Sequence, residues 1–201
     1  MLGCFWIWLH QLTCNVSNQA KARKEDAHNK PWRPLPSGRI TEHQITLVRW
    51  MSASVCIVYS SILGDDIVFL TCGLFLTIIL YEEGGFAGHY VGKNLCNVGG
   101  YIAFEIGATK IIGEYDNFLS WAIQTNPGGL LGSSRNLDST SYASVIISGL
   151  LVLTTVQAQD FADVEGDKQL GRVTFPIRAP QFSRLWTLLA MVAWSAVLTW
   201  F

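Results

Sequence analysis

Six apolar stretches separated by polar segments run along the whole chain. Each is a run of mostly hydrophobic residues, and together they cover residues 2–16, 44–63, 67–81, 95–112, 142–156 and 185–201. A membrane-spanning helix needs about 20 mostly apolar residues, and fewer where polar groups anchor its ends. The third stretch is short and the fourth contains Glu105 and Lys110. The pattern as a whole nevertheless predicts an all-α, multi-helix transmembrane bundle.

The composition supports a membrane protein. Of the 201 residues, 50% are hydrophobic and only 14% are charged, whereas an average soluble domain has about 25% charged residues. The formal net charge of −1 argues against a nucleic-acid partner. The five cysteines are odd in number and lack CxxC spacing, so neither a disulfide framework nor a zinc site is predicted.

The basic residues are distributed unequally among the polar connections. Most of them follow the first and the fifth apolar stretch, and Lys93 precedes the fourth. Four crossings separate the two basic connections, so both are expected on one face of the membrane if all four segments span it. The positive-inside rule makes that face cytoplasmic or its equivalent. The sequence therefore predicts one site assembled from three places in the chain. The Gly-, Ser- and Asn-rich segment 113–141 is expected to be an ordinary loop on the other face.

Three aspartates follow the fifth apolar stretch. Asp160, Asp163 and Asp167 are spaced i, i+3 and i+7, so they share one face if the helix continues past Val156. Such a stripe is costly at the membrane boundary unless a cation neutralises it. Oxygen ligands favour Mg²⁺, which is typically bound by one or two carboxylates and the phosphates of a substrate. The alternative is a solvated acidic helix end.

A second acidic cluster lies in the connection after the first apolar stretch. Asn18 and Asp26 are eight residues apart and thus on one helical face, with Glu25 beside them. Three prolines between residues 31 and 36 end any helix there and stiffen the segment that contains Lys30 and Arg33. These cations could bind phosphate oxygens. Alternatively, the basic residues only determine the membrane topology.

The two polar segments together resemble a known family. "NQ...ED..NKPWRPLPSGR" at 18–39 and "QDFADVEGD...GRVTFP" at 159–176 look like the paired aspartate-rich motifs of the UbiA superfamily of intramembrane prenyltransferases. The resemblance is greatest to its fungal branch, which includes terpene cyclases. "HYVGKN" at 89–94 and "GGYIAFEIGATK" at 99–110 extend it, so that it covers nearly the whole chain.

The resemblance implies one UbiA-type domain over residues 1–201, with a central cavity between helices. Its acidic motifs would hold Mg²⁺ ions that bind the diphosphate of a prenyl diphosphate. The implied metal ligands are Asn18, Glu25, Asp26, Asp160, Asp163 and Asp167. The residues implied to bind the diphosphate are Asn18, Lys30, Arg33, Tyr90, Lys93 and Arg172. The implied catalytic residues are Asp26, Asp160, Asp163 and Asp167.

The sequence departs from the superfamily in two respects. Gln19 and Ala22 stand where the commonest first motif has aspartates, and Glu25 is expected to compensate for them. Relatives usually have nine helices, and the six here match the second to the seventh. The first helix and the last two would be absent, which suggests a truncated gene model, a fragment or a decayed paralogue.

Three functions are compatible with these features. The leading hypothesis is transfer of a prenyl group to an acceptor, expected to be aromatic. The second is a UbiA-type terpene cyclase that acts on the prenyl diphosphate alone. The third is a non-catalytic protein, either an inactive truncated paralogue or a membrane transporter. In each case we expect a multi-pass protein in the lipid bilayer, in the endoplasmic reticulum or another internal membrane.

Overall fold

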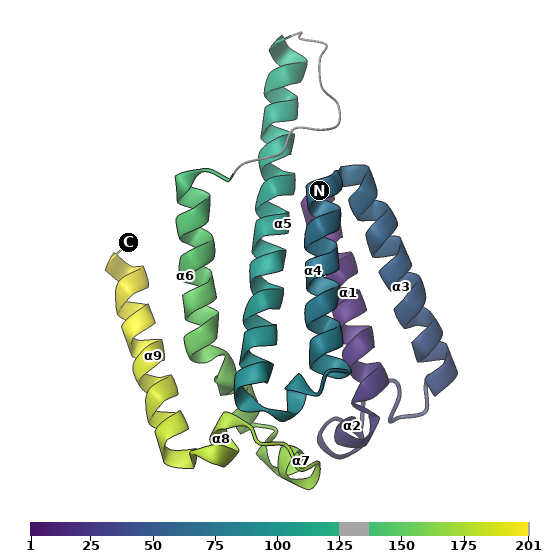
Figure 1. The fold of residues 1–201 in the computed structure, drawn as a ribbon, viewed down its shortest axis with the longest axis vertical. Coiled ribbons are helices and arrows are strands. Elements are labelled where there is room, and N and C mark those ends of the chain that lie inside the picture. Colours follow the sequence, from purple (N-terminus) through teal and green to yellow (C-terminus); the bar gives the residue numbers. More distant parts are fainter. Residues whose placement is uncertain (125–136, 201) are drawn as a thin grey trace.

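A computed structural model describes residues 1–124 and 137–200 of the chain. Within this part, six long helices stand side by side, with α5 in the middle (Figure 1). The long helices are α1 (Leu2–Lys21), α3 (Glu42–Leu63), α4 (Asp65–Glu82), α5 (Tyr90–Gln124), α6 (Ser139–Thr155) and α9 (Pro180–Trp200). The short ones are α2 (Arg23–Asn29), η1 (Phe86–Gly88), η2 (Val156–Phe161), α7 (Val164–Gln169) and α8 (Phe175–Arg178). The predicted all-α bundle is confirmed.

The bundle is organised around α5. Helix α5 packs against α4, α6 and α1, while α3 covers α1 and α4 on one side and α9 packs against α6 on the other. The short helices α2, α7 and α8 all lie at one end, the lower end in Figure 1. This end is called the polar end below. The two basic connections thus lie on one side of the bundle, as the count of crossings predicts.

Local sequence explains where several helices begin and end. Thr41 and Gln44 form a capping box at the start of α3, with each side chain bonded to the other's backbone N–H. Gly64, whose φ of 138° is rarely adopted by other residues, separates α3 from α4. The side chain of Asp138 accepts a hydrogen bond from the backbone N–H of Ser141 and caps α6.

The predicted boundaries of two helices and one loop are wrong. The helix expected to carry Asp160, Asp163 and Asp167 does not continue past Val156, because the α-helix gives way to the 3-10 turns of η2 and then to α7. The helix through Asn18 and Asp26 is interrupted at Ala22. The expected loop 113–141 is helical up to Gln124 and again from Ser139, and residues 125–136 lie outside the described part.

Three of the described helices are long and apolar enough to cross a membrane. They span Glu42–Leu63, Ser139–Phe161 and Pro180–Trp200. Most of their side chains face outward, and exposed leucines, valines and tryptophans are frequent on α3 and α9. By the same measure of length and hydropathy the other three predicted spans fall short. Helix α4, for example, has carboxylates at both ends, Asp65, Asp66 and Glu82.

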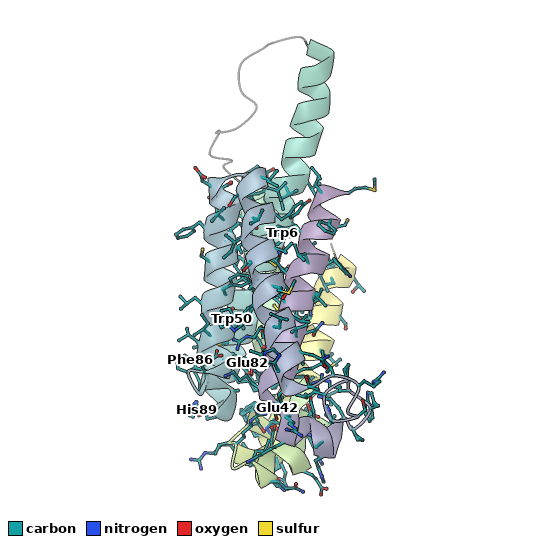
Figure 2. All side chains as sticks on the ribbon, turned by 90° about the vertical axis from the view of Figure 1, so that its right-hand side faces the viewer. Trp6, Glu42, Trp50, Glu82, Phe86 and His89 are labelled. Carbon is teal, nitrogen blue, oxygen red and sulfur yellow. The ribbon has the colours of Figure 1, made fainter. Side chains whose placement is uncertain are left out.

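The apolar core lies in the half of the bundle away from the polar end. Trp6, Leu63, Ile67 and Ile111 pack together there from α1, α3, α4 and α5. Trp6 is fully buried and lies in the upper half of the molecule, far from Glu82 (Figure 2). Gly107 on α5 faces the Trp6 ring so closely that a Cβ atom would lie 2.5 Å from its Cη2.

A closed ring of hydrogen bonds is buried beside this core. Trp6 Nε1 donates to Ser60 Oγ (3.0 Å), which lies 2.7 Å from Thr71 Oγ1. His10 joins Thr71 Oγ1 through Nε2 (3.0 Å) and the carbonyl of Trp6 through Nδ1 (2.8 Å). Because the indole N–H only donates and the carbonyl only accepts, every direction in the ring is determined. His10 therefore has a structural role.

Glu105 in the middle of α5 also has a structural partner. It accepts hydrogen bonds from Ser144 Oγ (2.9 Å) and Ser148 Oγ (3.1 Å) of α6. An acidic residue within an apolar helix can mark an ion path, which is the basis of the transporter hypothesis. Here the carboxylate joins two neighbouring helices, and this removes one argument for transport.

Candidate active site

The two acidic segments meet at the polar end of the bundle. Helix α2 carries Glu25 and Asp26, and α7 with the preceding turn carries Asp163 and Asp167. The two helices are in contact, and Gly166 allows the approach, because a Cβ atom there would overlap the side chain of Asn29. Both segments thus face a common region.

Two ion pairs join the segments across the chain. Lys30 Nζ lies 3.3 Å from Asp163 Oδ2, and Arg172 Nη1 lies 2.5 Å from Glu25 Oε2. The same nitrogen of Arg172 is 3.3 Å from Asp167 Oδ1. Burial alone would lower the pKa of Arg172, but the carboxylates of Glu25 and Asp167 outweigh it and raise the pKa above the usual value. The guanidinium therefore fixes α7 against α2 as a permanent cation.

Two further pairs bury their carboxylates almost completely. Arg33 Nη1 donates to both oxygens of Asp26, at 2.7 and 2.9 Å, and Asp26 is only 1% exposed. Lys93 Nζ lies 2.7 Å from Asp160 Oδ1, with both residues buried. Helix α5 thus supplies a cation from its first turn to a carboxylate that follows α6. Charges are rarely buried in proteins unless they are paired or bind an ion.

Among the described residues, three buried carboxylate oxygens have no hydrogen-bond partner. They are both oxygens of Asp160, of which Oδ1 meets Lys93 Nζ only as an ion pair, and Oδ2 of the fully buried Asp167. Lys93 Nζ lies 4.0 Å from Asp167 Oδ2. Buried polar atoms without partners are rare in native proteins and commonly indicate a missing ion or water. The donor set, made of oxygens only, fits a hard divalent cation.

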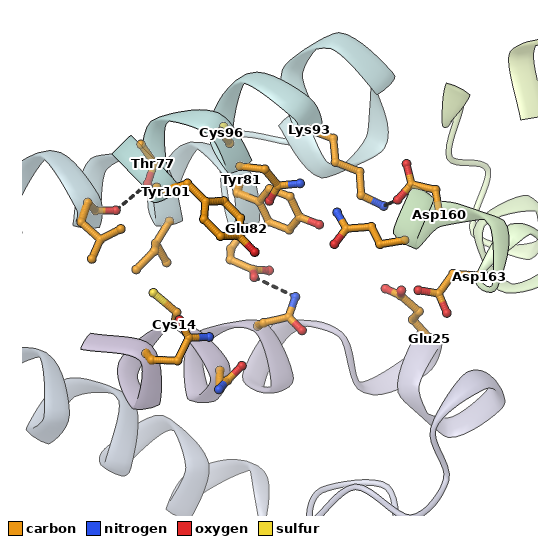
Figure 3. Close-up of a pocket in the computed structure, with 18 of the residues that line it drawn as sticks. Cys14, Glu25, Thr77, Tyr81, Glu82, Lys93, Cys96, Tyr101, Asp160 and Asp163 are labelled. Atoms are coloured by element: carbon orange, nitrogen blue, oxygen red, sulfur yellow. Dashed lines mark hydrogen bonds and ion pairs between the residues drawn. The ribbon is translucent and has the colours of Figure 1, made fainter. Parts of the chain in front are cut away.

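A cavity of about 530 Å³ extends from this cluster between α1, α4 and α5 (Figure 3). Seven of the predicted site residues line it, namely Asn18, Glu25, Lys30, Arg33, Lys93, Asp160 and Asp163. Asp26, Asp167 and Arg172 lie behind them and bind their side chains through the ion pairs described above. Tyr90 does not line the cavity, since its ring stacks against Phe175 outside it.

Besides Lys93 and Asn18, the cavity wall includes polar residues that the sequence pattern did not single out. Lys93, Asn97 and Tyr101 follow one another at intervals of four on α5, so they form a column on one helical face. Gln11, Asn15 and Asn18 form a similar column on α1. The remaining ones are Thr77, Tyr81 and Glu82 of α4 and Gln159 of η2. Spacing of polar residues at i and i+3 or i+4 within an apolar stretch is the signal that would have found the two columns.

Within the described residues, no three acidic, histidine or cysteine side chains are close enough together to hold a metal ion. Five acidic residues of the two segments each lie beside a basic partner instead, whereas Glu165 is exposed. The five are Glu25, Asp26, Asp160, Asp163 and Asp167. Their arrangement is that of a charged cluster held together by its own counterions.

Comparison with known proteins identifies the family. The model of the UbiA prenyltransferase family matches residues 1–201, and the chain belongs to this family of membrane-embedded proteins. The resemblance seen in the two acidic motifs is thereby confirmed.

Three curated relatives illustrate the range of the family. The chain is 33% identical to the fumagillin beta-trans-bergamotene synthase of Aspergillus fumigatus over 95% of its own length and 59% of the relative's. It is 27% identical to the diterpene cyclase eriG of Hericium erinaceus, over 86% of this chain and 49% of the relative. It is also 27% identical to the polyprenyl transferase eriF of the same fungus, over 86% of this chain and 52% of the relative. The chain thus spans about half of the length of these relatives. Among solved structures, none is a significant match.

Proposed function

We propose that the chain ionises a prenyl diphosphate at its polar end and holds the prenyl group in the adjoining cavity. The observation that supports this most is the convergence of two distant acidic segments and their basic partners on one cavity. A diphosphate with a divalent cation needs both signs of charge at one place, and a prenyl group needs space beside it. The names of the curated relatives agree with such a substrate.

A divalent cation, in our proposal Mg²⁺, belongs to this site. The unpartnered oxygens of Asp160 and Asp167 fit it, as does the oxygen-only donor set. The residues that would hold the cation are Asn18, Glu25, Asp26, Asp160, Asp163 and Asp167. When bound, it supplies positive charge that stabilises the departing diphosphate.

The basic side chains contribute to the same charge stabilisation. Lys30, Arg33, Lys93 and Arg172 each have more donors than their carboxylate partners use, since an ammonium group has three and a guanidinium five. The first three line the cavity, where phosphate oxygens could accept hydrogen bonds from their remaining donors. Fixed cations in a site of low polarity stabilise developing negative charge strongly.

The cation formed on the prenyl chain is captured, in our proposal, by a double bond of the same chain. The carbon–oxygen bond breaks and its electron pair leaves with the diphosphate; the double bond then attacks, and loss of a proton gives a cyclic hydrocarbon. Leu74, Ile78 and Phe104 supply apolar surface in the cavity, and an aromatic face can attract a carbocation. The relatives named as synthase and cyclase support this outcome.

Transfer to an aromatic acceptor is the second candidate. It is favoured by the relative named as a polyprenyl transferase and by the polar column on α5. Asn97 has a buried side-chain nitrogen without a hydrogen-bond partner, and both Asn97 and Tyr101 line the cavity. A phenol or carbonyl group of an acceptor could use these side chains, whereas a hydrocarbon chain could not.

One experiment tests ionisation and separates the two outcomes. The purified chain in lipid nanodiscs is incubated with Mg²⁺ and farnesyl or geranylgeranyl diphosphate, without an acceptor. Release of pyrophosphate and the organic products are measured, and the Asp163→Asn variant is the control. A cyclic hydrocarbon supports cyclisation, whereas a product that forms only with added phenols supports transfer. If the wild type releases no more pyrophosphate than the variant, both catalytic functions are excluded. The inactive paralogue and the transporter then remain as hypotheses.

Placement in the endoplasmic reticulum or another internal membrane, with the polar end toward the cytoplasm, is also part of the proposal. It is supported by the basic residues gathered at that end. Protease protection of tags placed after residue 30 and within 125–136 would test the orientation.

A further inference from the structure

Two adjacent glutamates at the end of α4 have different surroundings. Glu83 is exposed and forms salt bridges with Arg49 Nη1 (2.8 Å) and Lys21 Nζ (3.4 Å). Glu82 lines the cavity and accepts a hydrogen bond from Asn18 Nδ2 at 3.1 Å (Figure 3). In the described part of the chain no basic side chain forms a salt bridge with Glu82. It therefore differs from Glu25, Asp26, Asp160, Asp163 and Asp167 of the two motif segments, each of which has a cationic partner.

The bond to Glu82 determines how the Asn18 amide is oriented. Asn18 Oδ1 lies 3.4 Å from Arg33 Nη1, the same atom that binds Asp26. A guanidinium can only donate and an ionised carboxylate can only accept. With Glu82 ionised, the amide therefore has one satisfactory orientation, with its nitrogen toward Glu82 and its oxygen toward Arg33. Since the two ends of an amide have nearly the same shape, packing alone would not distinguish them.

We propose that Glu82 is a positioning residue, which directs the oxygen of Asn18 toward the metal–diphosphate site. The inference rests on the proposed function, because it assumes that Asn18 is a ligand there. An asparagine can bind a hard cation only through its oxygen. With its nitrogen turned toward the site, Asn18 would present a donor to the cation and repel it. Groups that orient ligands in this way typically change metal affinity about 10- to 100-fold when they are mutated.

The Glu82→Gln variant tests this role with little change in shape. Two amides can pair in either direction, so the variant keeps a hydrogen bond but no longer selects the orientation of Asn18. We expect the Kd for Mn²⁺, measured by electron paramagnetic resonance with inorganic pyrophosphate present, to rise about 10-fold or more. The melting temperature without ions should stay unchanged. The matched control is Glu83→Gln, which removes the neighbouring carboxylate and should leave the Mn²⁺ affinity as in the wild type.

A double variant tests the orientation directly. In Asn18→Asp with Glu82→Gln, the new glutamine amide can donate to the new carboxylate, and either oxygen of that carboxylate can face the site. Most of the lost Mn²⁺ affinity should return. To exclude a general effect of added negative charge, Asn15→Asp is combined with Glu82→Gln. Asn15 is on the same face of α1 and lines the cavity, and this combination should not restore affinity.

The possible failures are distinguishable. If wild-type protein binds no Mn²⁺ with pyrophosphate, the proposed function is overturned, and the role of Glu82 with it. If the wild type binds Mn²⁺ and Glu82→Gln binds it equally well, only the positioning role is overturned. A lower melting temperature of Glu82→Gln in the absence of ions, without a change in Mn²⁺ affinity, would show that the residue only stabilises the fold.

Discussion

Two buried polar clusters in the described part of the bundle differ in how completely their polar atoms are hydrogen-bonded. In the ring formed by Trp6, His10, Ser60 and Thr71, each donor meets one acceptor. At the polar end the side chains are charged, and buried oxygens of Asp160 and Asp167 have no donor. Both clusters join several helices. Only the second has unused capacity to bind something else.

This difference separates a structural cluster from a binding site on physical grounds. A closed ring of neutral hydrogen bonds stabilises the fold and gains nothing from a ligand. A cluster of buried charges is expensive to assemble, and its ion pairs offset the desolvation cost only in part. Substitutions in the first cluster should therefore lower stability, whereas those in the second should mainly lower activity.

The largest effect is expected for Asp160→Asn. The variant removes a carboxylate that lines the cavity and has an unpartnered oxygen. Loss of one electrostatic group of a site typically lowers the rate about 100- to 1,000-fold. Lys93 still has Asp167 at 4.0 Å, so the fold should persist. Pyrophosphate release and thermal unfolding measure the two properties, and a variant with nearly wild-type turnover would contradict the assignment of this site.

Gly107→Ala should have the next largest effect, and on stability alone. The new Cβ atom would lie 2.5 Å from Trp6 Cη2 and 2.8 Å from Cζ3. The indole cannot retreat easily, because its nitrogen is bound to Ser60. Overpacking of this kind costs about 2 to 3 kcal/mol. The control is Gly73→Ala on α4, where a Cβ atom meets nothing within 4 Å.

Thermal and denaturant unfolding in detergent would measure both glycine variants. Equal stability of Gly107→Ala and Gly73→Ala would contradict the close packing of α1 on α5. Pyrophosphate release per folded molecule should be unchanged in either.

Ser60→Ala should be somewhat milder. It leaves Trp6 Nε1 without an acceptor and removes one partner of Thr71. A buried donor without a partner costs about 1 to 2 kcal/mol. We expect a lower melting temperature and unchanged affinity for Mn²⁺ with pyrophosphate. A matched comparison is Ser54→Ala on the same helix, since that exposed hydroxyl bonds only to the backbone of its own helix.

The helices, and the end of the bundle at which the candidate site lies, could be predicted from the sequence. The detailed geometry of the site could not. Apolar runs and the distribution of basic residues predict six helices and bring Lys30 and Asp163 to the same end. The predicted helical stripe from Asp160 to Asp167 is wrong, because η2 and a turn interrupt it. Side chains of Asp favour turns over helix interiors, and a spacing rule does not include this competition.

Glu82 shows a second limit of the sequence. It is followed by Glu83, and nothing in the pair indicates which carboxylate turns inward. The choice depends on how α4 is rotated against α1, where Asn18 is on one side and Lys21 on the other. Rotation of a helix is determined by packing along its whole length. It becomes known only from the folded structure.

Gly166→Ala should have the smallest effect on stability, although its clash is closer than that of Gly107→Ala. The atoms it would meet belong to the side chain of Asn29, with Cγ at 2.7 Å, and that side chain is free at its end, where the buried Nδ2 has no hydrogen bond. Asn29 can rotate away, whereas the Trp6 ring cannot, so we expect a loss of stability below about 1 kcal/mol.

The displacement in Gly166→Ala would still separate α2 from α7 slightly, and would lengthen the ion pairs Lys30–Asp163 and Arg172–Glu25. Pyrophosphate release should therefore fall more than stability does, about 10-fold, as expected when charged groups are misplaced. Asn29→Ala combined with Gly166→Ala removes the clash and should restore part of the activity. If Gly166→Ala instead unfolds the protein as readily as Gly107→Ala does, the polar end is as rigid as the core, and the distinction between a closed and an open cluster does not hold.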